Sequence, residues 1–104
     1  MKPREVLLLD DAVRDLRAIH DHVRRASESR RVAESYLKKI RHHLRPLAYS
    51  AAAYPRFFHQ SGKDSGYRFC IVGNHVAFFT FDNDHVHIKR VLHKRMQVDD
   101  SLLT

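Results

Sequence analysis

The sequence predicts an α+β fold, a single domain over residues 1–104 in which two helices pack on a mainly antiparallel sheet. In the segment 66–95, three runs rich in Val, Ile and Phe are separated by Gly73-Asn74 and Asn83-Asp84. Two-residue turn signals between such runs are typical of consecutive β-hairpins. Upstream, two stretches with apolar residues at helical spacing predict two helices, and a short apolar run precedes them. The predicted order is therefore strand, helix, helix and a three-strand meander (β-α-α-β-β-β), followed by a short C-terminal tail.

The composition indicates a basic, soluble protein of the cytoplasm. Nineteen Lys and Arg residues against twelve Asp and Glu give a formal net charge of +7, which favours an acidic partner. Such a partner is nucleic acid, an acidic protein or an anionic surface. The single cysteine, Cys70, cannot form an internal disulfide, which suits a reducing compartment. The apolar run near the start is too short for a signal peptide, and no segment has membrane-spanning length, so we expect no membrane contact.

The first two predicted elements are a short strand and a helix. The strand is the apolar run 6–9, and Asp10-Asp11 behind it suits a helix N-terminus, because Asp caps free N–H groups and complements the helix dipole. The residues that follow recur at helical spacing and predict one apolar face: Ala12, Leu16, Ile19 and Val23. This helix is predicted to end near Arg25-Ala26.

The second predicted helix has a longer apolar stripe than the first and is expected to run antiparallel to it. Ser27 or Ser29 is its expected N-cap, and Pro46 should stop or kink its end. The stripe consists of Ala33, Leu37, Ile40, Leu44 and Leu47, with Tyr36 beside it. So short a link between two amphipathic helices predicts a helical hairpin. The next segment, 50–65, has no periodicity and is predicted to be a surface loop, with a helical turn at 51–54 and Phe57 and Phe58 as anchors.

The turns set the pairing of the meander strands. Gly73 suits a type II′ turn that places Val72 opposite His75, and Asn83-Asp84 suits a type I′ turn that places Asp82 opposite His85. With regular pairing, the face toward the helices contains Arg68, Cys70, Val72, His75, Ala77, Phe79, Phe81, Val86, Ile88, Arg90 and Leu92. The other face contains Tyr67, Phe69, Ile71, Val76, Phe78, Thr80, His87, Lys89, Val91 and His93. Because two helices cover one face only, we expect the second face to stay uncovered and to bind a partner.

Three segments carry a resemblance to a known family: GYRFC (66–70), GNHVAFF (73–79) and HVHIKRVLHKRM (85–96). They resemble the C-terminal half of the ParE branch of the RelE/ParE superfamily of bacterial toxins. Upstream, Asp15-Leu16 with Ile19, and Ala33, Tyr36 and Ile40, resemble its two helices. The similarity covers nearly the whole chain.

The resemblance implies the toxin of a bacterial type II toxin–antitoxin system, a class linked to plasmid stabilisation. Such a toxin is held inactive in a hetero-oligomer by a cognate acidic antitoxin, often ParD-like, and its described target is DNA gyrase. It acts by protein–protein binding, and the resemblance implies no cofactor. A basic domain with an uncovered apolar face agrees with this, because it suits an acidic amphipathic segment that folds on binding.

Two sets of residues form the predicted binding sites. The basic end of the meander, together with Arg68, is the expected target surface: Arg68, Lys89, Arg90, His93, Lys94, Arg95 and Met96. The apolar centre of the second face is the expected antitoxin site: Tyr67, Phe69, Ile71, Val76 and Phe78. For Arg68 and Arg90, a structural salt bridge or an antitoxin contact is the alternative role.

Two other functions stay open from the sequence. One is a RelE-like, ribosome-dependent mRNA endonuclease, in which His93 would transfer protons while Arg90 and Arg95 hold the scissile phosphate. No carboxylate or Tyr follows His93 closely enough to complete an acid/base set, so we expect no catalytic residues. The other is a divergent, non-toxic binding module. Direct nucleic-acid binding is less favoured than protein binding.

The nine histidines do not predict a metal site. His85 and His87 alternate on one side of a predicted strand, and His42-His43 lie in a helix. No Cys pair, HExxH motif or closely spaced carboxylate completes a zinc or non-haem iron set. We therefore expect these histidines to be exposed polar residues.

Overall fold

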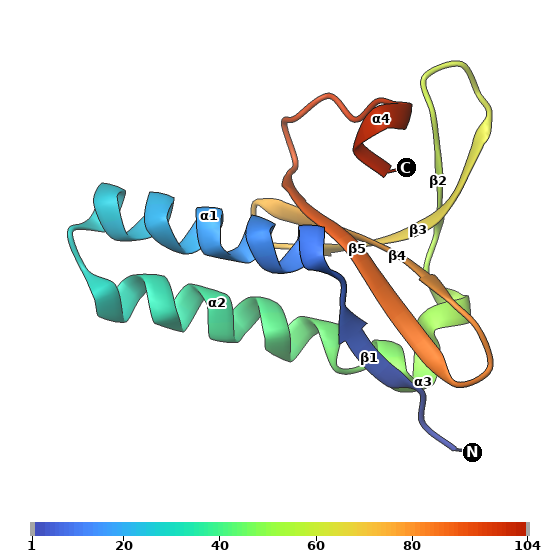
Figure 1. The fold of residues 1–104 in the computed structure, drawn as a ribbon, viewed down its shortest axis with the longest axis horizontal. Coiled ribbons are helices and arrows are strands. Elements are labelled where there is room, and N and C mark those ends of the chain that lie inside the picture. The colour runs from blue at the N-terminus through green and yellow to red at the C-terminus, as the bar shows by residue number, and fades with distance from the viewer. Residues whose placement is uncertain (1, 104) are drawn as a thin grey trace.

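A five-stranded mixed sheet with a helical hairpin on one face makes up the body of the computed structural model, which describes residues 2–103 (Figure 1). The elements are β1 (Glu5–Leu8), α1 (Asp10–Ser27), α2 (Arg30–Leu44), α3 (Leu47–Ser50), a 3-10 turn η1 (Ala51–Ala53), β2 (Arg56–Phe58), β3 (Asp64–Val72), β4 (His75–Phe81), β5 (His85–His93) and α4 (Asp100–Leu103). The strand order is β1-β5-β4-β3-β2, with β1 parallel to β5 and the other pairs antiparallel. This confirms the predicted α+β class.

The helical hairpin forms as its apolar stripes predict. α1 runs two residues past the predicted end, to Ser27, and Glu28 follows in the left-handed conformation with φ 56°. The Ser29 side chain accepts a hydrogen bond from the Val32 N–H at 3.2 Å and caps α2. Asp10 and Asp11 lie in the first turn of α1 without capping it, where they complement the helix dipole, and Asp11 also pairs with Arg14. α2 ends two residues before Pro46, as expected.

The two stripes and the inner face of the sheet form one core. It contains four of the five residues predicted in the second stripe, with Leu47 in α3, three of the four predicted in the α1 stripe, and inner residues of the strands. Its buried members include Ala12, Leu16, Ile19, Leu37, Ile40, Leu44, Leu47, Cys70, Val72, Ala77, Phe79, Val86 and Ile88, with Ala33 also buried in the hairpin. Phe79 and Ile88 are fully buried at its centre, where α1 and α2 cover β4 and β5.

The segment predicted to be a loop contains a strand. Arg56–Phe58 forms β2, which pairs with β3 at the edge of the sheet. A three-residue strand carries too few residues to show an alternation, so it could not be predicted from periodicity. The η1 turn at 51–53 agrees with the predicted helical turn. Phe57 is half-buried and anchors the segment, whereas Phe58 is 53 % exposed and does not.

A β-bulge in β5 corrects the predicted register. Val72 pairs with His75 and Phe81 with Val86, as the turns required, but Phe79 pairs with Ile88 while Phe78 pairs with Arg90. Lys89 is therefore an extra residue, and every later side chain of β5 changes face. Arg90 and Leu92 lie on the face of Phe78, and Val91 and His93 lie on the helix-covered face with Ala77 and His75. This reverses the prediction for these four β5 residues.

The turn between β4 and β5 also differs from the type I′ turn predicted. Neither Asn83 nor Asp84 has a positive φ. Instead, Asp82 Oδ1 accepts hydrogen bonds from the backbone N–H groups of Asp84 at 2.8 Å and His85 at 2.7 Å. The Asp82 side chain thus stabilises this turn, which lacks the positive φ angles of a type I′ turn.

The outer face of the sheet is not uncovered, because the C-terminal tail folds back over it. Phe78, Leu92 and Leu103 form a second buried cluster, and Leu103 from α4 is only 1 % exposed. Figure 1 shows α4 beside β5 and away from the α1–α2 hairpin. A four-residue helix in a short tail gives no periodic signal, so the sequence did not predict this cover. Ile71 stays 62 % exposed beyond its reach.

No helix among residues 2–103 combines the length and the apolar character that crossing a membrane requires.

Candidate functional site

The carboxylate of Asp15 closes the open edge of β5. β1 pairs with β5 only as far as Leu8 and Ile88, so the next edge donor of β5 has no strand partner there. α1 begins directly behind β1 and brings Asp15 alongside, where its Oδ2 accepts the Val91 N–H at 2.9 Å. Unpaired edge donors are a liability of any sheet, and here a side chain satisfies one.

Arg90 connects this carboxylate to the C-terminal helix. Its Nε and Nη2 donate to the two oxygens of Asp15 at 2.7 Å and 2.9 Å, a bidentate pair, and its Nη1 donates to the Leu102 carbonyl at 3.3 Å. The Arg90 side chain is 19 % exposed and that of Asp15 is 14 % exposed. Hydrogen bonding to Asp15 raises the pKa of Arg90, although partial burial opposes this. The pair therefore holds α1, β5 and α4 together.

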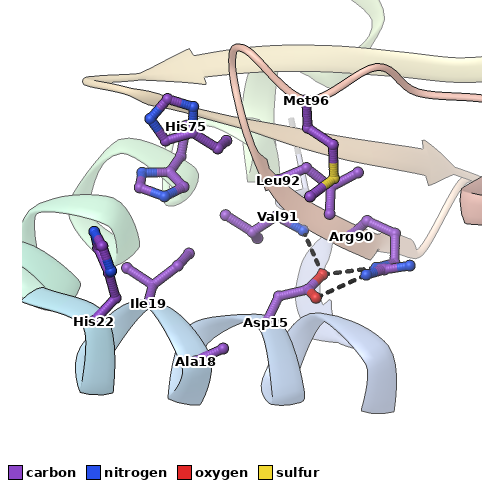
Figure 2. A pocket seen from close by; sticks show the side chains of 10 residues that line it. Asp15, Ala18, Ile19, His22, His75, Arg90, Val91, Leu92 and Met96 are labelled. Atoms are coloured by element: carbon purple, nitrogen blue, oxygen red, sulfur yellow. Dashed lines mark hydrogen bonds and ion pairs between the residues drawn. The ribbon is translucent and has the colours of Figure 1, made fainter.

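A cleft with a volume of about 340 Å³ lies between α1 and the end of β5 (Figure 2). Figure 2 shows Asp15, Ile19 and His22 on α1, facing His75 and Val91 across the cleft. Its lining comprises Asp15, Ala18, Ile19, His22, His75, Arg90, Val91, Leu92, His93 and Met96.

Three histidines converge on this cleft. The rings of His75 and His93 meet edge to face with centroids 5.3 Å apart, and the His75 Nδ1 lies 2.6 Å from the Tyr36 hydroxyl. Burial lowers the pKa of His75, and the neighbouring His93 and His22 lower it further. Tyr36 also fits tightly against the β3–β4 turn, because a Cβ at Gly73 would lie 3.3 Å from its hydroxyl.

The chain turns sharply after β5 and presents an exposed basic and apolar segment. The Lys94 N–H donates to the Asn74 carbonyl at 2.8 Å, and the Met96 N–H donates to the His93 carbonyl at 2.9 Å. The Arg95 N–H donates to His93 Nδ1 at 3.1 Å. These bonds fix the backbone of residues 93–96, which we call the basic turn, while Met96 is 49 % exposed.

The structure brings together only part of the predicted target surface. Arg90, His93 and Met96 line the cleft, and the basic turn contains Lys94 and Arg95. Lys89 lies in the bulge with its Nζ 3.9 Å from Asp11. Arg68 lies elsewhere, with Nη1 donating to the Tyr54 carbonyl at 2.7 Å and its guanidinium 5.5 Å from the Phe81 ring centroid. It is therefore not part of a surface with the basic turn.

Sequence reasoning missed the part of the site that comes from α1 and β4. Asp15, His22 and His75 line the cleft, but none of them belonged to the predicted binding sets. Asp15 was marked only by its place near the helix start, which many solvent-facing acids share, and by the family resemblance of Asp15-Leu16, which assigned it no binding role. The bulge at Lys89, which turns Val91 toward α1, has no local sequence mark.

Three of the five predicted antitoxin residues, Phe69, Val76 and Phe78, line an apolar groove on the outer face. Phe69 pairs with Phe78 and Ile71 with Val76 across β3 and β4. A groove of about 180 Å³ is lined by Phe57, Phe69, Val76, Phe78, His93, Lys94, Met96 and Val98. Phe78 is only 2 % exposed, and Tyr67, Phe69 and Val76 are half-buried against the same cluster, so α4 and the tail already occupy part of this face.

The groups that a ribonuclease mechanism would use are held in other contacts. Arg90 is paired with Asp15, and His93 accepts the Arg95 N–H through Nδ1. The lowered pKa of His75 favours a neutral ring, which suits packing more than phosphate binding. Arg90 and His93 are thus engaged within the protein, whereas the Arg95 side chain is exposed.

The expectation that no carboxylate accompanies the strand histidines is wrong. The β4–β5 turn brings Asp82 to His85 and His87, and one ligand atom from each lies within 4.8 Å of the others. The predicted pairing of Asp82 with His85 already implied that this carboxylate lies beside the strand histidines. The cluster shares no residue with the lining of the cleft.

Comparison with known proteins gives one family and a shared fold. Residues 6–98 match the sequence model of the ParE toxin of the type II toxin–antitoxin system parDE. Among solved structures, the chain superposes on one described as the chromosomal ParDE TA system from P. aeruginosa, with a TM-score of 0.70 and 20 % identity. The match covers 86 % of this chain and 95 % of that one. Comparison with curated protein sequences gives no significant match.

Replacing Asp15 by Asn should destabilise the fold by about 2–3 kcal/mol, because it weakens a bidentate pair and the Val91 bond in a mostly buried place. The measurement is the free energy of unfolding from urea titration. The matched control is Asp21→Asn on the same helix, where the side chain is 62 % exposed and lies 3.8 Å from His20. We expect the control to change stability by less than about 0.5 kcal/mol. Equal effects of the two substitutions would contradict the role given to Asp15.

His75 should make stability depend on pH near neutrality. Its pKa is lowered in the folded state, so the unfolded chain binds more protons below the ordinary value of 6.5. The contribution of the neutral ring is therefore complete above pH 6.5 and is lost as pH falls toward the lowered pKa. In urea titrations at pH 7.5 and 5.5, His75→Gln should lose less stability on acidification than the parent chain. His42→Gln, which removes an exposed histidine on α2, is the control, and an unchanged loss in His75→Gln would refute the assignment.

Proposed function

The chain belongs to the ParE toxin family of type II toxin–antitoxin systems, and from this premise we propose that it inhibits DNA gyrase by protein–protein binding and is neutralised by a cognate antitoxin. The family match over residues 6–98 is the observation that carries the proposal. Gyrase acts on DNA inside bacterial cells, so the proposal also places this toxin in the cytoplasm.

The basic turn is the surface we propose for the target. Its backbone is fixed by hydrogen bonds to Asn74 and within the turn, so the backbone loses little freedom on binding. It combines cationic side chains, Lys94 and Arg95, with an exposed apolar one, Met96. Interfaces favour Met and Arg in this combination, with the apolar group central and the charges at the rim.

Arg90 and Lys89 have a positioning role in this proposal. Arg90 forms an ion pair with Asp15 of α1, and Lys89 lies at ion-pair distance from Asp11 of the same helix. Their contribution is to hold the end of β5 against the helix so that the basic turn keeps its place. Arg68, which binds the Tyr54 carbonyl, contributes to the other end of the sheet and is not proposed as part of this surface.

The antitoxin is proposed to bind the exposed part of the outer face. Ile71, 62 % exposed, and the half-buried Phe69 and Val76 form an apolar strip that α4 leaves accessible. With a chain charge of +7, an acidic amphipathic segment that orders on binding is the partner of complementary chemistry. Contact with Phe78 would require α4 to move, because Leu103 covers that ring.

A gyrase supercoiling assay tests both surfaces at once. We expect the purified chain to inhibit supercoiling at micromolar concentration, and Met96→Asp or Arg95→Ala to weaken inhibition at least about tenfold, the loss of one interface contact of about 1.4 kcal/mol. Ile71→Asp is the matched control at an exposed apolar residue of the outer face. It should keep the inhibition but weaken neutralisation by the antitoxin encoded beside the toxin gene.

The outcomes separate the candidate functions. No inhibition by folded protein at micromolar excess would contradict gyrase as the target. Cleavage of mRNA in a translating extract, abolished by His93→Ala, would instead support a ribosome-dependent endonuclease. A chain that does neither and does not slow growth without its antitoxin would be a binding module only.

A further inference from the structure

Three potential metal ligands converge at the closed end of the β4–β5 hairpin, away from the cleft. His87 Nε2 lies 3.5 Å from Asp82 Oδ2, and His85 Nδ1 lies 3.7 Å from Asp82 Oδ1. A single ligand atom from each of the three residues can be chosen so that all lie within 4.8 Å of one another. The proposed toxin activity uses none of these residues.

The hairpin holds these groups in place before any ion binds. His85 and His87 are alternate residues of β5, so their side chains share one face of the sheet, and their ring centroids are 5.7 Å apart. Asp82 cannot swing away, because its Oδ1 accepts the N–H groups of Asp84 and His85. Its Oδ2 is thereby directed toward His87.

The spacing matches a coordination shell. Ligand atoms bound tetrahedrally at about 2.1 Å lie roughly 3.4 Å from one another. The separations at Asp82, 3.7 Å from His85 Nδ1 to Oδ1 and 3.5 Å from His87 Nε2 to Oδ2, are near that value. One ligand atom from each residue lies within 4.8 Å of the others, so side-chain rotations that draw the groups together would complete the shell. Both contacts are within ion-pair distance, so the carboxylate already faces both imidazoles before an ion binds.

Glu5 supplies the outer partner that a metal-binding histidine normally has. It is the Cα partner of His85 in the parallel β1–β5 pair, and its Oε2 lies 3.9 Å from His85 Nε2. With a metal on Nδ1, the Nε2–H of His85 would donate to this carboxylate, an arrangement that fixes the ring and raises its basicity. The two ring nitrogens of His85 thus face two carboxylates with separate roles.

We propose that Asp82, His85 and His87 bind one divalent cation of the zinc class, with Glu5 orienting His85. Two imidazoles and one carboxylate suit Zn²⁺, Ni²⁺ or Cu²⁺, whereas Ca²⁺ and Mg²⁺ need oxygen ligands. The side chains of His85 and His87 are 40 % and 33 % exposed, so an ion can enter from solvent and a water can complete the shell. The bound ion cross-links the β4–β5 turn to β5 and stabilises the side of the sheet where β1 joins.

Isothermal titration of the full chain with ZnCl₂ at pH 7.5, in a buffer that does not chelate zinc, tests the site. We expect one ion per chain and a higher melting temperature with zinc than with EDTA. His85→Gln and His87→Gln should each weaken binding at least about tenfold, and Glu5→Gln about tenfold through the loss of its outer-shell contact. The control His42→Gln, His43→Gln removes an adjacent histidine pair on α2 and should leave the affinity unchanged.

A second measurement keeps the test informative if a variant folds poorly. Co²⁺ bound by nitrogen and oxygen at four or five positions gives visible d–d absorption, and Zn²⁺ should displace it in the parent chain. No zinc binding at millimolar concentration would overturn the proposal, and so would binding that survives the combined His85→Gln, His87→Gln substitution. Binding lost only in the His42 and His43 control would do so as well.

Discussion

The structure depends on the carboxylate of Asp15, which lies where β1 ends and the rest of β5 becomes the edge of the sheet. β1 is only four residues long and leaves β5 after Ile88, so the outer half of β5 would lack a neighbour on that side. Asp15 takes this place by binding the Val91 N–H and the Arg90 guanidinium together. Arg90 extends the contact to the Leu102 carbonyl of α4. Helix, strand and tail are therefore joined through a single mostly buried ion pair.

The bulge at Lys89 makes this contact possible. Without the extra residue, Val91 would face away from α1, and its side chain would not reach the core that it shares with Phe79 and Leu16. The bulge also moves Leu92 to the outer face, where it packs with Phe78 and Leu103. One inserted residue thus places Val91 in the core under the helices and Leu92 in the cluster on the outer face. With regular pairing, the two side chains would exchange faces.

Most of the architecture could be predicted from the sequence, because the helical stripes and the two hairpin turns are strong periodic signals. The pairs Val72–His75 and Phe81–Val86 followed from turn positions alone. The features that the sequence did not predict are short or non-periodic: β2, α4 and the bulge. The bulge matters most for the site. The segment 88–91 is compatible with an alternating strand in either register, so the sequence does not reveal the extra residue. Family resemblance pointed to the C-terminal segment, but it could not show that Arg90 is held by Asp15.

The two proposed partner surfaces adjoin, because Lys94 and Met96 of the basic turn line the same groove as Phe69 and Val76, and both surfaces are linked to the Asp15–Arg90 contact. The basic turn extends from the end of β5, which Asp15 and Arg90 hold, whereas the antitoxin strip around Ile71 lies beyond the reach of α4. An antitoxin that extended from Ile71 toward Phe78 would meet α4 and, through Leu102, the Arg90 contact. Such an antitoxin would reach the basic turn both by direct contact in the shared groove and through the hydrogen bond from Arg90 to the Leu102 carbonyl of α4.

Hydrogen–deuterium exchange of this chain in complex with gyrase tests the central claim, that the basic turn is the binding surface. The account requires increased protection of residues 93–97 in the complex, with no change in the Arg68 region or in the hairpin end at 82–87. Protection confined to those other regions, or exchange identical to that of the free chain under conditions where the chain is folded, would contradict it.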